Sequence, residues 1–149
     1  MKPNTVFRYF DELELGDRMV TRARTITESD LVNFAALTWD SYALHTDTVY
    51  ASETMFGERI AHGMLVLSYT IGLFNLQPGP LQAFYGIDNL RFTHPVKIGD
   101  TIHAELEIRE LQGRDDRCGV STNSLQVLNQ KGEMVIAGRL KMLLARRPE

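Results

Sequence analysis

The strongest constraint on this chain is its longest apolar segment, which runs from residue 63 to about residue 76. Its apolar side chains fall on every side of a helical wheel, and they are Met64, Leu65, Val66, Leu67, Tyr69, Ile71, Leu73, Phe74 and Leu76. A helix that is apolar all round is buried, so this segment predicts a core helix. Pro78 and Pro80 end it, because proline lacks an amide hydrogen and clashes with the preceding turn.

The second half of the chain changes to a period of two. Apolar residues alternate with polar ones over residues 102–109, which is the pattern of a strand with one buried and one wet face. Further strands are predicted over residues 84–92, 120–128 and 133–145, with a hairpin turn at residues 129–132. We therefore predict an α+β fold, in which an antiparallel sheet wraps around one long buried helix.

The residues before the core helix predict a strand over 19–25 and an amphipathic helix over 28–38. Thr27 and Asp30 have the spacing of a capping box at the start of that helix. An irregular loop follows it. Asp47 is well placed to cap a short helical turn over residues 49–53.

The composition limits the class of protein. The chain has 149 residues, the size of one domain, and its 16 basic and 19 acidic residues give a net charge of −3. That balance argues against a nucleic-acid-binding protein, which usually has a basic excess. Cys118 has no second cysteine to pair with, which fits a reducing compartment. No stretch approaches the about 18 apolar residues of a membrane span, and no signal peptide is recognisable, so we expect a soluble, cytoplasmic protein.

Candidate acid–base residues lie just before the core helix. Asp40 and His45 are five positions apart in a segment that is not strongly helical, so a loop can bring both side chains to one point. A carboxylate beside an imidazole is a common acid–base pair that can activate water. The alternative is that Asp40 only forms a turn at a helix end and His45 is a half-buried loop residue.

The pair His62-Gly63 opens the core helix. The first amide hydrogens of a helix lack intrahelical partners and carry the positive end of its dipole. Glycine lets a ligand approach this backbone, so Gly63 could hold a carbonyl oxygen while negative charge develops on it. The alternative is a glycine needed only for a tight entry into the helix. The four histidines show no metal-ligand spacing with the acids, so we expect no metal, and we assign no role to His94 or His103.

Two runs of sequence around these residues match a known family. FAALTWDSYALHTD and FGERIAHGML resemble the MaoC-like dehydratase, or (R)-specific enoyl-CoA hydratase, family, which has the hot-dog fold. LRFTHPVKIGDTIHAELEI and VLNQKGEMVIAG extend the resemblance over nearly the whole chain. It implies a single MaoC-like hot-dog domain over residues 1–149, in which the protein is a homodimer or a dimer of dimers.

The family motif has the form D-x-N-P-x-H, and Asp40 and His45 match its first and last positions. The resemblance implies that these two residues activate water, and that the amide of Gly63 polarises a thioester carbonyl. The reaction would be reversible hydration of a trans-2-enoyl thioester to the (R)-3-hydroxyacyl thioester. Coenzyme A would carry the substrate, with no other cofactor. We expect Gly63, His62, Tyr42 and Ser68 to bind the substrate.

The chain departs from the motif at its centre, where Tyr42 and Ala43 replace the family's Asn and Pro. Loss of the proline loosens the loop. The Tyr42 hydroxyl either takes over the role of the asparagine or reshapes the acyl pocket, so the substrate could carry a branched, short or dicarboxylic acyl group. Two other functions stay open. A thioesterase is disfavoured because residues 64–75 contain no acid, and a non-catalytic acyl-CoA-binding subunit is disfavoured because Asp40 and His45 are both present.

Overall fold

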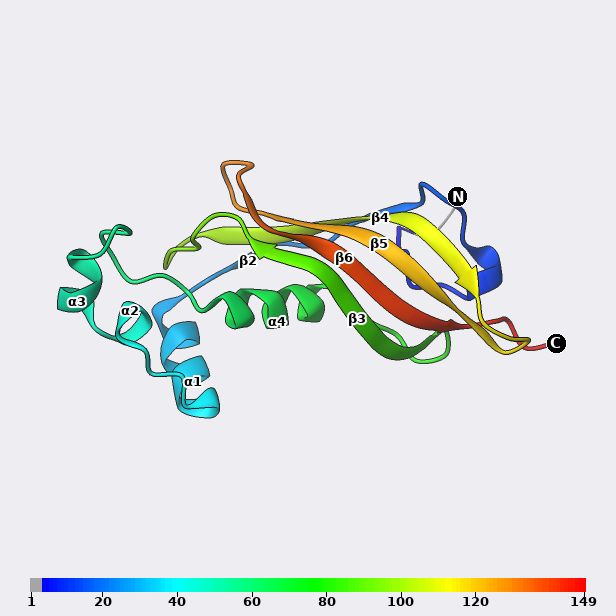
Figure 1. Ribbon diagram of the computed structural model, residues 1–149, viewed down its shortest axis with the longest axis horizontal. Helices are drawn as coiled ribbons and strands as arrows, with labels where there is room; N and C mark the ends of the chain where they lie inside the picture. Colours follow the sequence, from blue (N-terminus) through cyan, green and yellow to red (C-terminus); the bar gives the residue numbers. More distant parts are fainter. Residues whose placement is uncertain (1–3) are drawn as a thin grey trace.

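The computed structural model describes residues 4–149 and contains one long antiparallel sheet with helices at one end and along one face (Figure 1). Its elements are η1 (Phe10–Glu12), β1 (Arg18–Val20), β2 (Arg24–Thr25), α1 (Glu28–Thr38), α2 (Ala43–Thr46), α3 (Thr48–Ser52), α4 (Gly63–Leu73), β3 (Leu81–Phe92), β4 (Thr101–Gly113), β5 (Cys118–Leu128) and β6 (Met134–Ala145). The predicted α+β class is confirmed. None of the helices within residues 4–149 has the length and hydropathy of a membrane span.

The sheet has the strand order β1-β4-β5-β6-β3, and β2 pairs with β4 beside β1. Every pairing is antiparallel. The predicted turn between the last two strands is present, with Gly132 at a φ of 75°. β3 lies at an edge, because its one partner among the described residues is β6. Its pairing is irregular, and Phe84, Tyr85 and Phe92 on it are exposed.

Helix α4 lies along the concave face of the sheet and carries the centre of the core (Figure 1). Its buried residues are Leu65, Val66, Leu67, Thr70 and Leu73. The prediction that the helix is buried all round was wrong for one stripe, since Met64 is 56% exposed and Ser68 and Gly72 are exposed as well. The reason is that one sheet can cover only one side of a helix.

Helix α4 also ends earlier than predicted. Phe74 is its C-cap, and Asn75 has a φ of 53°, in the left-handed region. Asparagine tolerates this conformation better than most residues, so it turns the chain before the prolines are reached. The helix therefore stops at Leu73, and not near residue 76.

The predicted strand over residues 19–25 is interrupted at Thr21. The Thr21 amide donates to the Ala104 carbonyl at 2.9 Å, and the Ala104 amide donates to the Thr21 hydroxyl at 2.9 Å. A side chain thus takes the place of a backbone acceptor, which divides the segment into β1 and β2. Both parts still pair with β4.

The capping box of α1 is confirmed, and its acid joins three elements. Asp30 accepts from the Thr27 amide at 2.8 Å, and it also accepts from the Tyr69 hydroxyl of α4 at 2.9 Å. Arg24 of β2 donates to the same carboxylate at 3.1 Å. Burial by itself would raise the pKa of Asp30. The hydrogen bonds and the charge of Arg24 outweigh it, so this pKa lies below its ordinary value of 3.8.

Replacing Asp30 by asparagine should therefore lower the free energy of unfolding by about 2–4 kcal/mol at pH 7, because buried partners lose a charged acceptor. A lowered folded-state pKa gives stability that is present above the unfolded value and lost as pH falls. The free energies of unfolding of the two proteins, measured with urea, should thus converge as the pH falls below about 4. Asp116→Asn, at an exposed position, is the control. Equal stability of wild type and Asp30→Asn at pH 7 would contradict this role.

Candidate active site

The segment between α1 and α4 holds the candidate catalytic residues and lies beyond one end of the sheet (Figure 1). It is more helical than predicted, because α2 forms within it and carries His45. The predicted cap of the next turn is present, since the Tyr50 amide donates to the Asp47 carboxylate at 3.0 Å. Trp39 ends α1 with a φ of 64°, which turns the chain toward Asp40.

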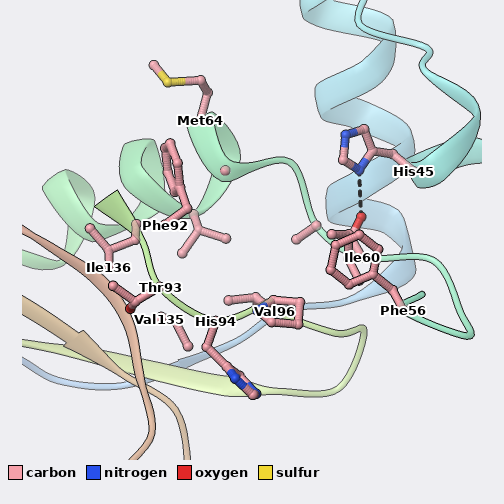
Figure 2. A pocket seen from close by; sticks show the side chains of 14 residues that line it. His45, Phe56, Ile60, Met64, Phe92, Thr93, His94, Val96, Val135 and Ile136 are labelled. Atoms are coloured by element: carbon pink, nitrogen blue, oxygen red, sulfur yellow. Dashed lines mark hydrogen bonds between the residues drawn. The ribbon is translucent and has the colours of Figure 1, made fainter. Parts of the chain in front are cut away.

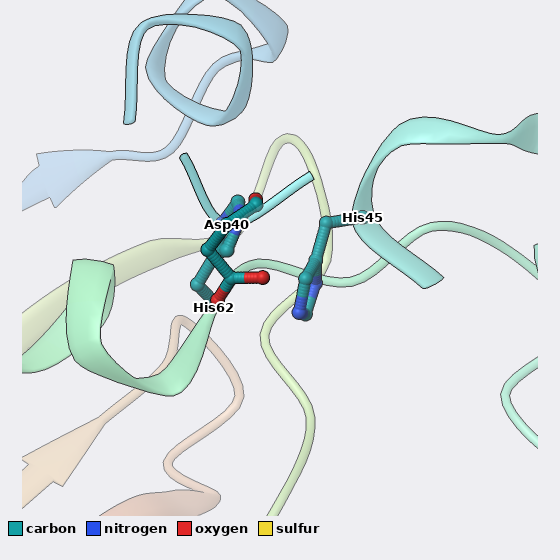
Figure 3. Close-up of side chains that lie close together, drawn as sticks. All are labelled: Asp40, His45 and His62. Carbon is teal, nitrogen blue, oxygen red and sulfur yellow. The ribbon is translucent and has the colours of Figure 1, made fainter. Parts of the chain in front are cut away.

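Asp40, His45 and His62 form one cluster (Figure 3). One carboxylate oxygen of Asp40 and one ring nitrogen of each histidine all lie within 4.8 Å of one another. Asp40 is exposed, His45 is half-buried and His62 is 2% exposed. The structure therefore brings together the two residues that the spacing singled out, and it adds a buried third beside them.

The hydrogen bond of His45 fixes its tautomer. His45 Nδ1 lies 2.7 Å from the Ile60 carbonyl oxygen (Figure 2). A carbonyl only accepts, so Nδ1 carries the proton, and in the neutral ring Nε2 keeps a lone pair. His45 can therefore accept a proton at Nε2 while the backbone holds its ring in place.

His62 is held in a similar way but lies deeper. Its Nε2 donates to the backbone carbonyl of Asp40 at 2.9 Å, and its Nδ1 is a buried acceptor that has no hydrogen-bond partner among the described residues. Burial lowers the pKa of His62, and the nearby His45 lowers it further, against the raising effect of Asp40. His62 is thus neutral at pH 7.

The cluster has the residue types of a metal site, but its ring geometry does not favour one. The rings of His45 and His62 are stacked, with centroids 3.9 Å apart and planes inclined by 28°. A nitrogen lone pair lies in the plane of its ring, so stacked rings hold their lone pairs in two separate, nearly parallel planes. Tetrahedral ligands must instead converge on one ion. The expected absence of a metal stays a prediction.

A cavity of about 460 Å³ opens beside His45 and reaches the start of α4 (Figure 2). Most of its walls are apolar, and its lining residues are His45, Phe56, Ile60, Ala61, Gly63, Met64, Val66, Phe92, Thr93, His94, Pro95, Val96, Val135 and Ile136. One end therefore presents an imidazole and a helix N-terminus, and the rest can take an apolar chain.

Gly63 is needed here for space, and not for a special backbone angle. Its φ is not positive, so its backbone conformation is open to other residues. A Cβ at this position, however, would lie 2.7 Å from the Phe92 ring. The close packing of Phe92 is by itself a structural reason for glycine, as the alternative proposed, so the role of the Gly63 amide stays a prediction. Gly63 is the first residue of α4, so its amide has no intrahelical acceptor, and no hydrogen bond found within residues 4–149 uses it.

Three of the predicted substrate-binding residues lie outside the cavity wall. His62 is buried behind it, and Ser68 lines a separate cavity of about 300 Å³, where its hydroxyl donates to the Met64 carbonyl. The Tyr42 hydroxyl lies 3.2 Å from that of Tyr50, which ties the N-cap of α2 to α3. Tyr42 thus stabilises the loop, and its ring meets the His45 ring edge-on.

Two residues of the site were missed from the sequence. Phe92 packs against Gly63, and His94, which pairs with Glu133 at 2.7 Å, lies on the cavity wall. Both come from the end of β3 and the loop after it, far along the chain from the motif. His103 is paired with Glu105 at 3.3 Å on β4.

Comparison with known proteins places this chain in a family. Protein MaoC of Klebsiella aerogenes is 47% identical over 100 residues, which are 66% of this chain but 30% of that protein. The chain thus spans less than a third of that relative. The (R)-specific enoyl-CoA hydratase of Rhodospirillum rubrum is 37% identical over 107 residues, or 71% of this chain and 73% of the hydratase.

Solved structures agree on the fold. The monoamine oxidase regulatory protein of Archaeoglobus is 41% identical, with a TM-score of 0.89 over 95% of this chain and 96% of that one. A Mycobacterium tuberculosis protein with a double hot-dog fold has a TM-score of 0.86 at 18% identity, over 100% of this chain and 47% of that one, which confirms the predicted hot-dog fold. The family described as "MaoC like domain" matches residues 12–129, so the chain belongs to the MaoC-like domain family.

Proposed function

We propose that the protein catalyses the reversible hydration of a trans-2-enoyl thioester to the (R)-3-hydroxyacyl thioester, with coenzyme A as the carrier. The observation that carries this proposal is that His45 and Gly63 both line one apolar cavity, with the Asp40 carboxylate within 4.8 Å of His45 and with no hydrogen bond found on the Gly63 amide within residues 4–149. A relative named (R)-specific enoyl-CoA hydratase and another named 3-hydroxybutyryl-CoA dehydratase support it.

The first half of the reaction is activation of water. Two groups whose oxygen and nitrogen atoms lie within 4.8 Å of each other can both contact one water molecule. His45 Nε2 carries the lone pair that can accept a proton from this water, and the Asp40 carboxylate can orient the water or share its proton. The hydroxyl adds to the β carbon of the enoyl group, and the same pair returns the proton to the α carbon.

The second half is stabilisation of the charge that develops on the thioester oxygen. The amide of Gly63 points from the N-terminus of α4, where the helix dipole is positive. A donor fixed at this position stabilises the enolate-like oxygen more than the neutral carbonyl, so it lowers the barrier. The apolar walls hold the acyl chain and exclude water from the reacting carbons.

The experiment is an assay with crotonyl-CoA that follows both the conjugated thioester absorbance and free thiol. Hydration predicts loss of absorbance without thiol, and formation of only the (R) product on a chiral column. Release of thiol would instead support a thioesterase. If neither the absorbance nor the free thiol changes, although calorimetry shows that crotonyl-CoA binds, the result would support a non-catalytic acyl-CoA-binding subunit and would overturn the proposal.

We further propose that the protein acts as a homodimer or a larger assembly of dimers. Two uncovered surfaces support this: the edge strand β3 with its exposed aromatic residues, and the outer stripe of α4 that begins at Met64. Proteins protect open sheet edges and bury large apolar patches, and a second copy would do both. Ser68 lies on this stripe, where a partner could bring it closer to the substrate.

A further inference from the structure

The segment of residues 60–63, which leads into α4, contacts every group of the candidate catalytic machinery. The Ile60 carbonyl accepts from His45, the His62 ring donates to the Asp40 carbonyl, and Gly63 presents its own amide. This segment is itself fixed to the sheet side of the molecule. The Ala61 amide donates to the Val96 carbonyl at 2.7 Å, and Ile60 forms an isolated β-bridge with Lys97.

Asp40 depends on this segment more than its position in sequence suggests. It is exposed and follows Trp39, which has left-handed backbone angles. Its amide donates to the Thr38 hydroxyl at 3.2 Å, and its carboxylate accepts from the Tyr42 amide at 3.4 Å. Both of these contacts are local. Within residues 4–149, the bond from His62 is the hydrogen bond that joins the main chain of Asp40 to the body of the protein.

The ring of His62 is well suited to fix a neighbour. It is 2% exposed, and its ring centroid lies 3.9 Å from that of His45 and 4.9 Å from that of Phe34. Three packed rings leave it little freedom. Since its neutral form keeps the proton on Nε2, the donor always faces the Asp40 carbonyl.

We propose that His62 is a positioning residue, which sets the distance between Asp40, His45 and the Gly63 amide through its Nε2–H donor, and does not itself touch the substrate. This proposal rests on the hydration proposed above. A loop acid and a helix amide that must act on two ends of one thioester need a fixed separation, because a misplacement of about 1 Å can cost about 10²-fold in rate.

Two variants separate the donor from the packing. His62→Gln keeps an N–H donor at the reach of Nε2 but loses the ring, whereas His62→Phe keeps the ring but loses the donor. If the donor positions Asp40, turnover of crotonyl-CoA should fall by about 10-fold to 100-fold in His62→Phe, with little change in KM, and should be largely rescued in His62→Gln. A purely structural role predicts the reverse order, since the phenyl ring fills the buried site better. That reverse order would overturn the proposal.

A second readout does not depend on turnover. Amide hydrogen exchange of the folded proteins should be faster over residues 39–42 in His62→Phe than in wild type and His62→Gln, while exchange in β4 and β5 stays unchanged. Equal exchange over residues 39–42 in all three proteins would also overturn the proposal. A wild type without hydratase activity would refute the proposed function, and the exchange measurement would still decide whether His62 fixes the position of Asp40.

Discussion

Asp40→Asn and His45→Ala are each expected to lower kcat for crotonyl-CoA hydration by about 10²-fold to 10⁴-fold, the range that a positioned acid–base group contributes. The Asn variant keeps the shape of the Asp40 side chain and its contact with the Tyr42 amide, but it cannot take a proton. The Ala variant removes the lone pair at Nε2 and leaves the Ile60 carbonyl without its donor. KM should change little, because neither residue is needed to hold the acyl chain.

The double variant tests whether the two residues act as one unit. Groups that share one water lose their effect together, so the double variant should be about as slow as the slower single one. Asp47→Asn is the matched control, because asparagine also serves as an N-cap and Asp47 lies in the same segment. Wild-type turnover in either single variant, with the fold intact by circular dichroism, would contradict the assignment.

Gly63→Ala is expected to lower kcat by about 10²-fold to 10³-fold, the loss seen when one oxyanion donor is displaced. The new methyl group would lie 2.7 Å from the Phe92 ring, closer than carbon atoms pack. Either the ring moves into the cavity or the first turn of α4 moves away from it. In both cases the amide and the substrate carbonyl no longer meet at hydrogen-bond distance.

Asn33→Ala is the control, because Asn33 is exposed in the interior of α1, away from the cavity and from the outer stripe of α4. It should leave turnover unchanged and stabilise the protein by a few tenths of a kcal/mol, since alanine has the higher helix propensity. If crowding is the cause, adding Phe92→Leu to Gly63→Ala should restore much of the lost activity relative to Phe92→Leu alone. A Gly63→Ala variant as active as Asn33→Ala would show that this amide is not used.

The features that could be predicted from the sequence are those set by neighbours along the chain. The capping box of Thr27 and Asp30 and the cap at Asp47 follow from spacings of three residues, and the structure contains both. Asp40 and His45 are five residues apart, and they meet for the same reason. The alternating pattern of β4 likewise depends on local geometry alone.

The features that could not be predicted depend on residues distant in sequence. Phe92 limits position 63 to glycine only because β3 returns beside the start of α4. The exposed stripe of α4 holds Met64, Ser68 and Gly72 and is less apolar than the buried face, but two small residues do not by themselves show which side the sheet covers. The bond from His62 to Asp40 crosses 22 positions, and the motif by itself gives no sign of it.

The contact between Phe92 and Gly63 has a consequence for how this protein could acquire new substrates. One aromatic ring is at once part of the cavity wall and the neighbour that limits the helix start. A larger or smaller side chain at position 92 would alter the room for an acyl chain and disturb the reaction centre together. A new acyl group that needs a different volume at position 92 would therefore require a compensating change at the start of α4.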